Sequence, residues 1–169
     1  MVLLALALAP AFVIMIFIYI KDKYEKEPIK LLLKNFGLGA TASIIITLIL
    51  GLILKIIFPT ADPLSISQQF LKAFIIVALV EEFSKYLIVR YYAQRNKEFD
   101  EPFDGIVYAV MVSMGFAALE NVMYVFQFGM SNGIVRAFTA VPAHATFGII
   151  MGYYMGKAKF AATKKDKIK

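Results

Sequence analysis

Residues 70–90 read Phe-Leu-Lys-Ala-Phe-Ile-Ile-Val-Ala-Leu-Val-Glu-Glu-Phe-Ser-Lys-Tyr-Leu-Ile-Val-Arg, an apolar run of membrane length with Glu81 and Glu82 side by side in its middle. A carboxylate inside a membrane is costly unless it is paired or faces water, so such residues mark functional sites. Neighbouring residues on a helix point about 100° apart, so one stray salt bridge does not account for both. The pair therefore indicates a functional site within a membrane helix.

The composition agrees with a membrane protein. The chain is 60% hydrophobic and only 18% charged, with a mean hydropathy of +0.73, whereas soluble domains carry about 25% charged residues. We expect one membrane-embedded helical domain over residues 1–169. The chain has no cysteine, which excludes disulfides and thiolate catalysis.

A spanning helix needs about 20 mostly apolar residues, and five runs of the sequence qualify. They cover residues 2–20, 33–58, 68–90, 103–127 and 137–156. We therefore predict an all-α, polytopic bundle with five spans. A cleaved signal peptide is the alternative for the first run, but its lysines follow the run rather than precede it, which favours a helix with its N-terminus outside.

The basic residues predict the orientation. Of 18 Lys and Arg, 14 lie in or beside the first link, the third link and the tail from Lys157 to Lys169. By the positive-inside rule these segments are cytoplasmic, which puts the N-terminus outside and the C-terminus inside. Because the net charge of +6 sits between hydrophobic runs, it favours membrane lipids as partners and argues against nucleic acid.

Polar residues on three of the predicted spans fall at a common depth. At about 1.5 Å per residue, Glu81 lies roughly 16 Å from Phe70, Glu120 about 10 Å from Gln127, and His144 about 12 Å from Arg136. Glu120 shares a helix face with Asn121. His144 is followed at four-residue spacing by three glycines, Gly148, Gly152 and Gly156. Small residues at this spacing allow close helix packing. We expect these three helices to bring Glu81, Glu120 and His144 to one site.

Structural roles remain as alternatives at this point. Lys85 follows Glu81 by four residues and Glu82 by three, so it can pair with either. Glu120 and Asn121 can hydrogen-bond across helices, and a single intramembrane histidine can bind a neighbouring carbonyl.

The chain resembles the PrsW family of glutamic-type intramembrane proteases, relatives of the CAAX-processing and bacteriocin-processing proteases. Three blocks on successive spans carry the resemblance, which covers residues 70–157. They are Glu81-Glu82-Phe-Ser-Lys85, the pair Gly105-Ile-Val-Tyr108-Ala with Gly115-Phe-Ala-Ala-Leu-Glu120-Asn121-Val-Met-Tyr124, and Pro142-Ala-His144-Ala-Thr-Phe147 running into Gly152-Tyr-Tyr-Met-Gly156.

The resemblance also raises an expectation that this sequence does not meet. Family members continue into a further span with a second histidine, followed four residues later by Asp or Asn. This sequence ends at Lys169 without that motif, so it is either truncated before a further C-terminal span or belongs to a member that lacks one.

The resemblance implies a membrane-embedded endopeptidase. Glu81 is then the favoured base that activates water, Glu82 and Glu120 belong to the catalytic set, and His144 or Asn121 donates to the oxyanion. Lys85 and Asn121 are supporting residues. No cofactor is favoured. The competing mechanism uses zinc, held by Glu81, Glu120 and His144.

Other functions stay open from the sequence. Buried Glu, Lys and His also suit a proton- or ion-coupled transporter component, and a catalytically silent membrane scaffold would keep the same fold. For the protease, the resemblance implies regulated proteolysis of a single-span membrane protein, similar to an anti-sigma factor, in a prokaryotic plasma membrane.

Overall fold

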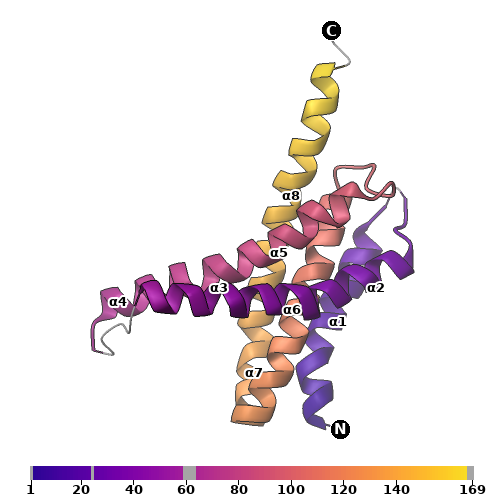
Figure 1. Ribbon diagram of the computed structural model, residues 1–169. Coiled ribbons are helices and arrows are strands. Elements are labelled where there is room, and N and C mark those ends of the chain that lie inside the picture. Colours follow the sequence, from indigo (N-terminus) through magenta and orange to yellow (C-terminus); the bar gives the residue numbers. More distant parts are fainter. Residues whose placement is uncertain (1, 24, 59–63, 167–169) are drawn as a thin grey trace.

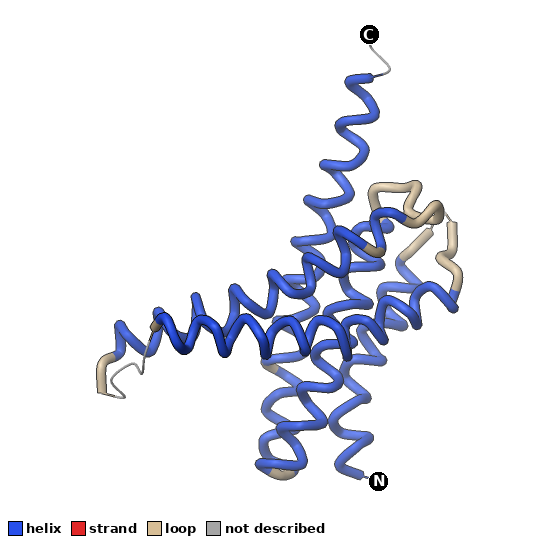
Figure 2. Tube along the Cα trace, viewed as in Figure 1, coloured by secondary structure: helices blue, strands red, loops and turns tan. Residues whose placement is uncertain are grey.

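The computed structural model describes residues 2–23, 25–58 and 64–166, all of them helices and short links (Figure 1). Figure 2 shows no strand among these residues. The helical segments follow one another along the chain in this order: α1 (Val2–Lys21), α2 (Ile29–Leu38), η1 (Gly39–Ser43), α3 (Ile44–Ile57), α4 (Ile66–Leu71), η2 (Lys72–Ala78), α5 (Leu79–Tyr91), η3 (Ala93–Arg95), α6 (Asp104–Phe128), α7 (Met130–Phe138) and α8 (Ala140–Asp166). The all-α prediction is confirmed.

Four stretches of the described chain are long and apolar enough to cross a membrane. They are Val2–Lys21, Ile29–Ile57, Asp104–Phe128 and Met130–Ala161. These match four of the five predicted spans, with ends that differ by a few residues. The remaining predicted span, 68–90, is helical through α4, η2 and α5 but is not among the four. It carries several charges, so its crossing remains a prediction.

Helix α6 is the centre of the molecule and contacts α1, α2, η1, α5, α7 and α8. Its residues from Val107 to Ala118 are buried without a break. Such all-round burial is typical of a helix enclosed by neighbours. Its ends follow from local chemistry. The Asp104 carboxylate accepts the backbone N–H of Glu101 at 2.6 Å, and Gly129 ends the helix with φ 82°, a conformation that glycine adopts at little cost.

The glycine stripe of α8 packs against α6, as its spacing predicts. A Cβ added at Gly152 would overlap the carbonyl oxygen of Gly105, and one at Gly148 would lie 2.7 Å from Ser113 Oγ. On the other side of α6, a Cβ at Gly115 would overlap the carbonyl oxygen of Phe36. Small residues thus bring backbones together on two sides of α6.

The helices form two sets that cross. α1, α6 and α8 run roughly along one direction, while α2–η1–α3 and α4–η2–α5 form a hairpin that crosses them steeply (Figures 1 and 2). Helix α3 packs against both α5 and η2. The helical bundle expected from the sequence therefore contains a hairpin that crosses the other helices, held through the contacts of η1 and α5 with α6.

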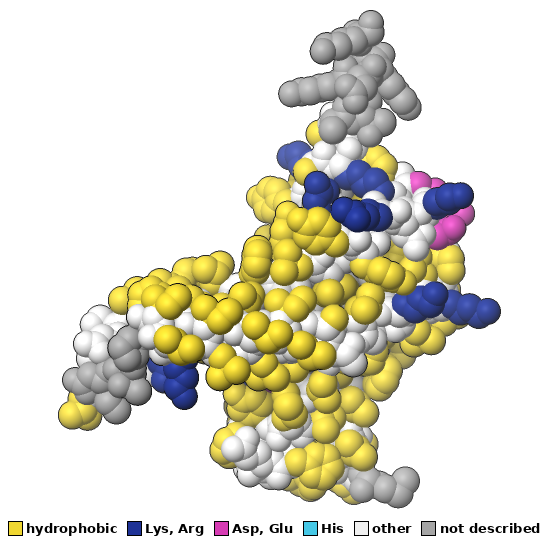
Figure 3. Space-filling model, viewed as in Figure 1, with side chains coloured by type: hydrophobic (Ala, Val, Ile, Leu, Met, Phe, Trp, Pro, Cys, Tyr) yellow, Lys and Arg dark blue, Asp and Glu magenta, His cyan; other side chains and the backbone are white. Residues whose placement is uncertain are grey.

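The links that carry the basic residues gather at one end. Residues 25–28 and 92–103 lie at this end, opposite the N-terminus of α1 and the turn between α6 and α7, and α8 runs past them and extends beyond (Figure 1). On the face that Figure 3 shows, hydrophobic side chains cover most of the surface, and most of the visible Lys and Arg lie towards this end. The predicted second link falls largely on residues 59–63, and Lys167 and Lys169 of the tail also lie outside the described residues. The orientation remains a prediction.

Candidate functional site

Helix α5 supplies the glutamate pair and Lys85. Residues three apart lie on one face of a helix, and Lys85 Nζ donates to Glu82 Oε1 at 2.6 Å. Lys85 is completely buried, and its ammonium group lies over the ring of Phe116 at 4.2 Å from the centroid. Of the two partners that the spacing allowed, Lys85 therefore takes Glu82.

His144 of α8 lies between Lys85 and Glu120. Its Nδ1 is 2.9 Å from Lys85 Nζ and its Nε2 is 3.0 Å from Glu120 Oε2. An ammonium group only donates hydrogen bonds, so Nδ1 accepts and the ring proton sits on Nε2, directed at Glu120. The ring of Phe116 meets the imidazole edge to face, with centroids 5.5 Å apart. The histidine thus links α5 to α6 in a fixed orientation.

Arg136 is a member of this site that was not predicted from the sequence. Its Nη2 donates to Glu120 Oε2 at 2.6 Å and its Nε donates to Asn121 Oδ1 at 2.7 Å. Its guanidinium also lies over the ring of Tyr124. Arg136 looked like a charge at the end of a span, because only the turn at Gly129 brings α7 back against α6.

Asn121 acts as a support. It is completely buried, its Oδ1 accepts from Arg136, and its Nδ2 donates to the carbonyl oxygen of Ala7 at 3.2 Å. These contacts hold α1 against α6 and orient Arg136. The amide is therefore committed to neighbouring protein groups, and the contacts give no support to its alternative role as an oxyanion donor.

Glu81 differs from the other two carboxylates. Glu82 is bound by Lys85, and Glu120 by Arg136 and His144. Within the described residues the Glu81 carboxylate has neither a hydrogen bond nor an ion pair, although the Glu81 backbone carbonyl accepts from Ser84 Oγ. A carboxylate oxygen of Glu81, one of Glu120 and a ring nitrogen of His144 all lie within 4.8 Å of one another. The three helices thus bring these donors together, as expected; their catalytic roles remain a prediction.

The same three residues fit a divalent metal ion in number and type. Catalytic zinc sites commonly use three protein ligands drawn from His and carboxylates and leave one position open. Arg136, which donates to Glu120 Oε2, would be an outer partner of the kind that orients a metal ligand. A further group of carboxylates with metal-ligand separations, Glu25, Asp100 and Glu101, lies in the links, and acidic groups of this sort are common without an ion.

Comparison with known proteins gives one consistent result. A family model described as "PrsW family intramembrane metalloprotease" matches residues 27–169. A protein named Protease PrsW from Geobacillus kaustophilus is 39% identical over 163 residues, which is 96% of this chain and 69% of the relative. The one from Oceanobacillus iheyensis is 39% identical over 98% of this chain and 73% of its own length. The Bacillus subtilis protein of that name is 35% identical over 96% of this chain and 71% of its own length. No solved structure matches the chain.

Proposed function

The chain belongs to the PrsW family of intramembrane proteases, and from this membership we propose that it hydrolyses a peptide bond of a membrane protein with a water molecule activated by Glu81. The coarse activity, proteolysis by a multi-pass membrane protein, agrees with the apolar helices and with the relatives. The assignment of roles to residues rests on the geometry of α5, α6 and α8.

One observation supports Glu81 as the base. It is the carboxylate of the site without a hydrogen-bond or ion-pair partner in the described residues, and one of its oxygens lies within 4.8 Å of a Glu120 carboxylate oxygen and a His144 ring nitrogen. A general base needs a free oxygen within reach of water. Glu82 has one oxygen bound to Lys85 and the other buried, so it is the poorer candidate.

The proposed reaction uses these positions in turn. Water is held between Glu81 and the Glu120–His144 pair, and Glu81 takes a proton as the water oxygen bonds to the carbonyl carbon. The carbonyl oxygen becomes an oxyanion, which the Nε2–H of His144 stabilises by sharing its hydrogen bond between Glu120 and the oxyanion. The intermediate then collapses, the C–N bond breaks, and Glu81 returns its proton to the leaving amine.

A metal-dependent form of the reaction is the second candidate, favoured by the family's description and by the convergence of three possible ligands, two carboxylates and one imidazole. Glu81, Glu120 and His144 would hold the ion. A divalent ion bound there would polarise the carbonyl and lower the pKa of bound water. Arg136 at Glu120 and Lys85 at Glu82 keep the same contacts in either form.

For the substrate we propose a single-span membrane protein, similar to an anti-sigma factor and cut in regulated proteolysis at the cell membrane. This follows the resemblance to the family.

The test uses the purified chain in proteoliposomes with a labelled single-span substrate. We expect Glu81→Gln to lower the cleavage rate at least about a hundredfold, because glutamine keeps the shape but does not take a proton. The matched control is Glu98→Gln, an exposed carboxyl in the link before α6, which should cleave normally. Near-normal cleavage by folded Glu81→Gln would remove Glu81 from this role.

Zinc content and chelation separate the two forms. Bound zinc that is lost in Glu81→Gln and in His144→Gln, together with inhibition by a chelator that added zinc reverses, supports the metal form. Full activity after chelation supports the metal-free form.

A further inference from the structure

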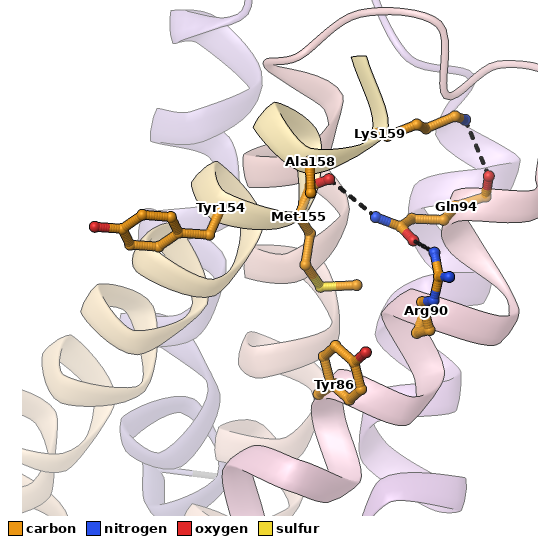
Figure 4. Close-up of a pocket in the computed structure, with 7 residues that line it drawn as sticks. All are labelled: Tyr86, Arg90, Gln94, Tyr154, Met155, Ala158 and Lys159. Carbon is orange, nitrogen blue, oxygen red and sulfur yellow. Dashed lines mark hydrogen bonds between the residues drawn. The ribbon is translucent and has the colours of Figure 1, made fainter. Parts of the chain in front are cut away.

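A groove lies between the end of α5 and α8, apart from the candidate site. Its volume is about 490 Å³, and it shares no residue with the site. The α5 side and η3 contribute Tyr86, Arg90 and Gln94, and α8 contributes Tyr154, Met155, Ala158 and Lys159 (Figure 4). These residues include two cations and two tyrosines but no carboxylate, so the lining attracts an anion.

Arg90 is oriented within this groove. Its Nη1 donates to Gln94 Oε1 at 2.6 Å, and Gln94 Nε2 donates to the carbonyl oxygen of Met155 at 3.1 Å, as Figure 4 shows. The remaining N–H groups of Arg90 have no hydrogen bond or ion pair within the described residues. An arginine held at one nitrogen presents the others as a planar fork, the geometry that binds phosphate oxygens.

Lys159 adds a second positive charge along the opposite wall. Its Nζ donates to the carbonyl oxygens of Phe99, at 2.6 Å, and Gln94, at 3.0 Å. These two bonds orient the ammonium group. The groove therefore combines an arginine fork with a fixed positive charge.

The surroundings indicate that the anion has an acyl chain. The groove lies beside the last turns of α5 and the second half of α8. Tyr86 and Tyr154 are exposed there by 37% and 63%, and tyrosines are enriched at headgroup level. Below it on α8, Phe147 and Ile150 continue the face of Tyr154 and are both about half exposed. That apolar strip gives an acyl chain a path into the hydrocarbon, which a free phosphate would not use.

We propose that this groove binds an anionic phospholipid, with the headgroup phosphate on Arg90 and an acyl chain along α8. Basic pockets between membrane helices bind such headgroups. The site would tie the ends of α5 and α8 together through a lipid, on the two helices that also carry Glu81 and His144. Its existence does not depend on the proteolytic mechanism.

The test titrates the purified chain in uncharged detergent with phosphatidylglycerol and follows thermal unfolding by circular dichroism. A ligand that binds the folded state raises Tm, and the concentration dependence gives an apparent Kd. We expect Tm to rise with phosphatidylglycerol but not with phosphatidylcholine or glycerol phosphate. Arg90→Gln should weaken the apparent Kd about tenfold, as the loss of a charge-assisted hydrogen bond predicts.

The matched control is Arg95→Gln, because Arg95 is an exposed arginine of the next turn that lies over Tyr91 rather than in the groove. It should bind like the unaltered chain. If Arg90→Gln folds poorly, Ala158→Phe tests the same site, since it fills the groove and keeps both charges.

Three results would overturn the proposal. The first is an unchanged Kd in both groove variants. The second is an equal rise of Tm with glycerol phosphate, which would make this a phosphate site. The third is a raised KM for the protein substrate in Arg90→Gln with an unchanged lipid titration, which would assign the groove to the substrate chain.

Discussion

Arg136 shows how one residue positions another in this site. It donates to Glu120 through Nη2 and to Asn121 through Nε, so two acceptors on α6 are fixed by one planar group. We predict that Arg136→Gln slows cleavage about ten- to hundredfold, because Glu120 loses its orientation. Cleavage rates of proteoliposome samples measure this effect.

The variant Arg136→Lys separates geometry from charge. A lysine keeps the positive charge but offers one nitrogen, which does not reach both acceptors in the same arrangement. We expect it to remain slow. Normal cleavage by Arg136→Lys would mean that charge alone matters at this position.

Glu27 lies outside the membrane spans, and its surroundings predict a pH dependence of stability. It is 5% exposed and accepts a hydrogen bond from Tyr108, which joins the first link to α6. Burial raises the pKa of Glu27 from 4.5 to about 8; the Tyr108 bond lowers it and nearby Asp104 raises it. Between these two pH values the folded state binds more protons than the unfolded state, so stability falls as pH rises.

We therefore predict that Tm in detergent decreases from about pH 5 to about pH 8 and that Glu27→Gln removes much of this slope. The control is Glu25→Gln, an exposed carboxyl of the same link. A slope that Glu27→Gln leaves unchanged would assign the titration to another group.

The residues of the site differ in how well sequence predicts them. Glu81, Glu82 and Lys85 are visible because charges are rare inside apolar runs, and helical depth relates them to Glu120 and His144. Arg136 stands among ordinary end charges, and its role depends on the fold of α7. Asn121 was placed on the correct face, but its contact with α1 depends on tertiary packing that spacing does not report.

At the scale of elements, the glycines of α8 control its distance from α6. A Cβ at Gly152 would overlap the Gly105 carbonyl oxygen, whereas one at Gly51 of α3 meets no atom within 4 Å. We predict that Gly152→Ala lowers stability by about 1–3 kcal/mol, since the two backbones must separate. Gly51→Ala should be neutral or stabilising, because alanine favours helix. Thermal unfolding of both variants tests this difference, and equal Tm values would contradict it.

Helix existence followed from apolar run length, but helix detail did not. The segments η1 and η2 are π-helical stretches inside predicted spans, and the break between α7 and α8 falls at Thr139, within the predicted fifth span. These features depend on neighbours: η1 packs where a Cβ at Gly39 would overlap the Val112 carbonyl oxygen. Hydropathy predicts which segments enter the lipid, but it carries no information on such backbone contacts.

At the scale of the whole molecule, the crossing of the hairpin over the bundle was not predicted. Run length and charge define which segments enter the membrane, but crossing angles are set by packing at contact residues. The placement of the links is a separate question from the crossing angles. Residues 25–28 and 92–103 lie at one end of the bundle, α8 extends beyond them, and the α3–α4 end of the hairpin lies to the side (Figure 1).

This arrangement makes the orientation testable with two single cysteines in a chain that has none. Asn96 lies in the link before α6, and Ser131, exposed on α7, follows the turn at the opposite end. Because basic residues gather around Asn96, the positive-inside rule puts that end in the cytoplasm. We predict that an impermeant thiol reagent added to intact cells labels Ser131→Cys and leaves Asn96→Cys unlabelled until the membrane is opened. Labelling of position 96 alone would mean that the orientation is the opposite of the predicted one. The groove with Arg90, at the same end as Asn96, would then face the outer leaflet.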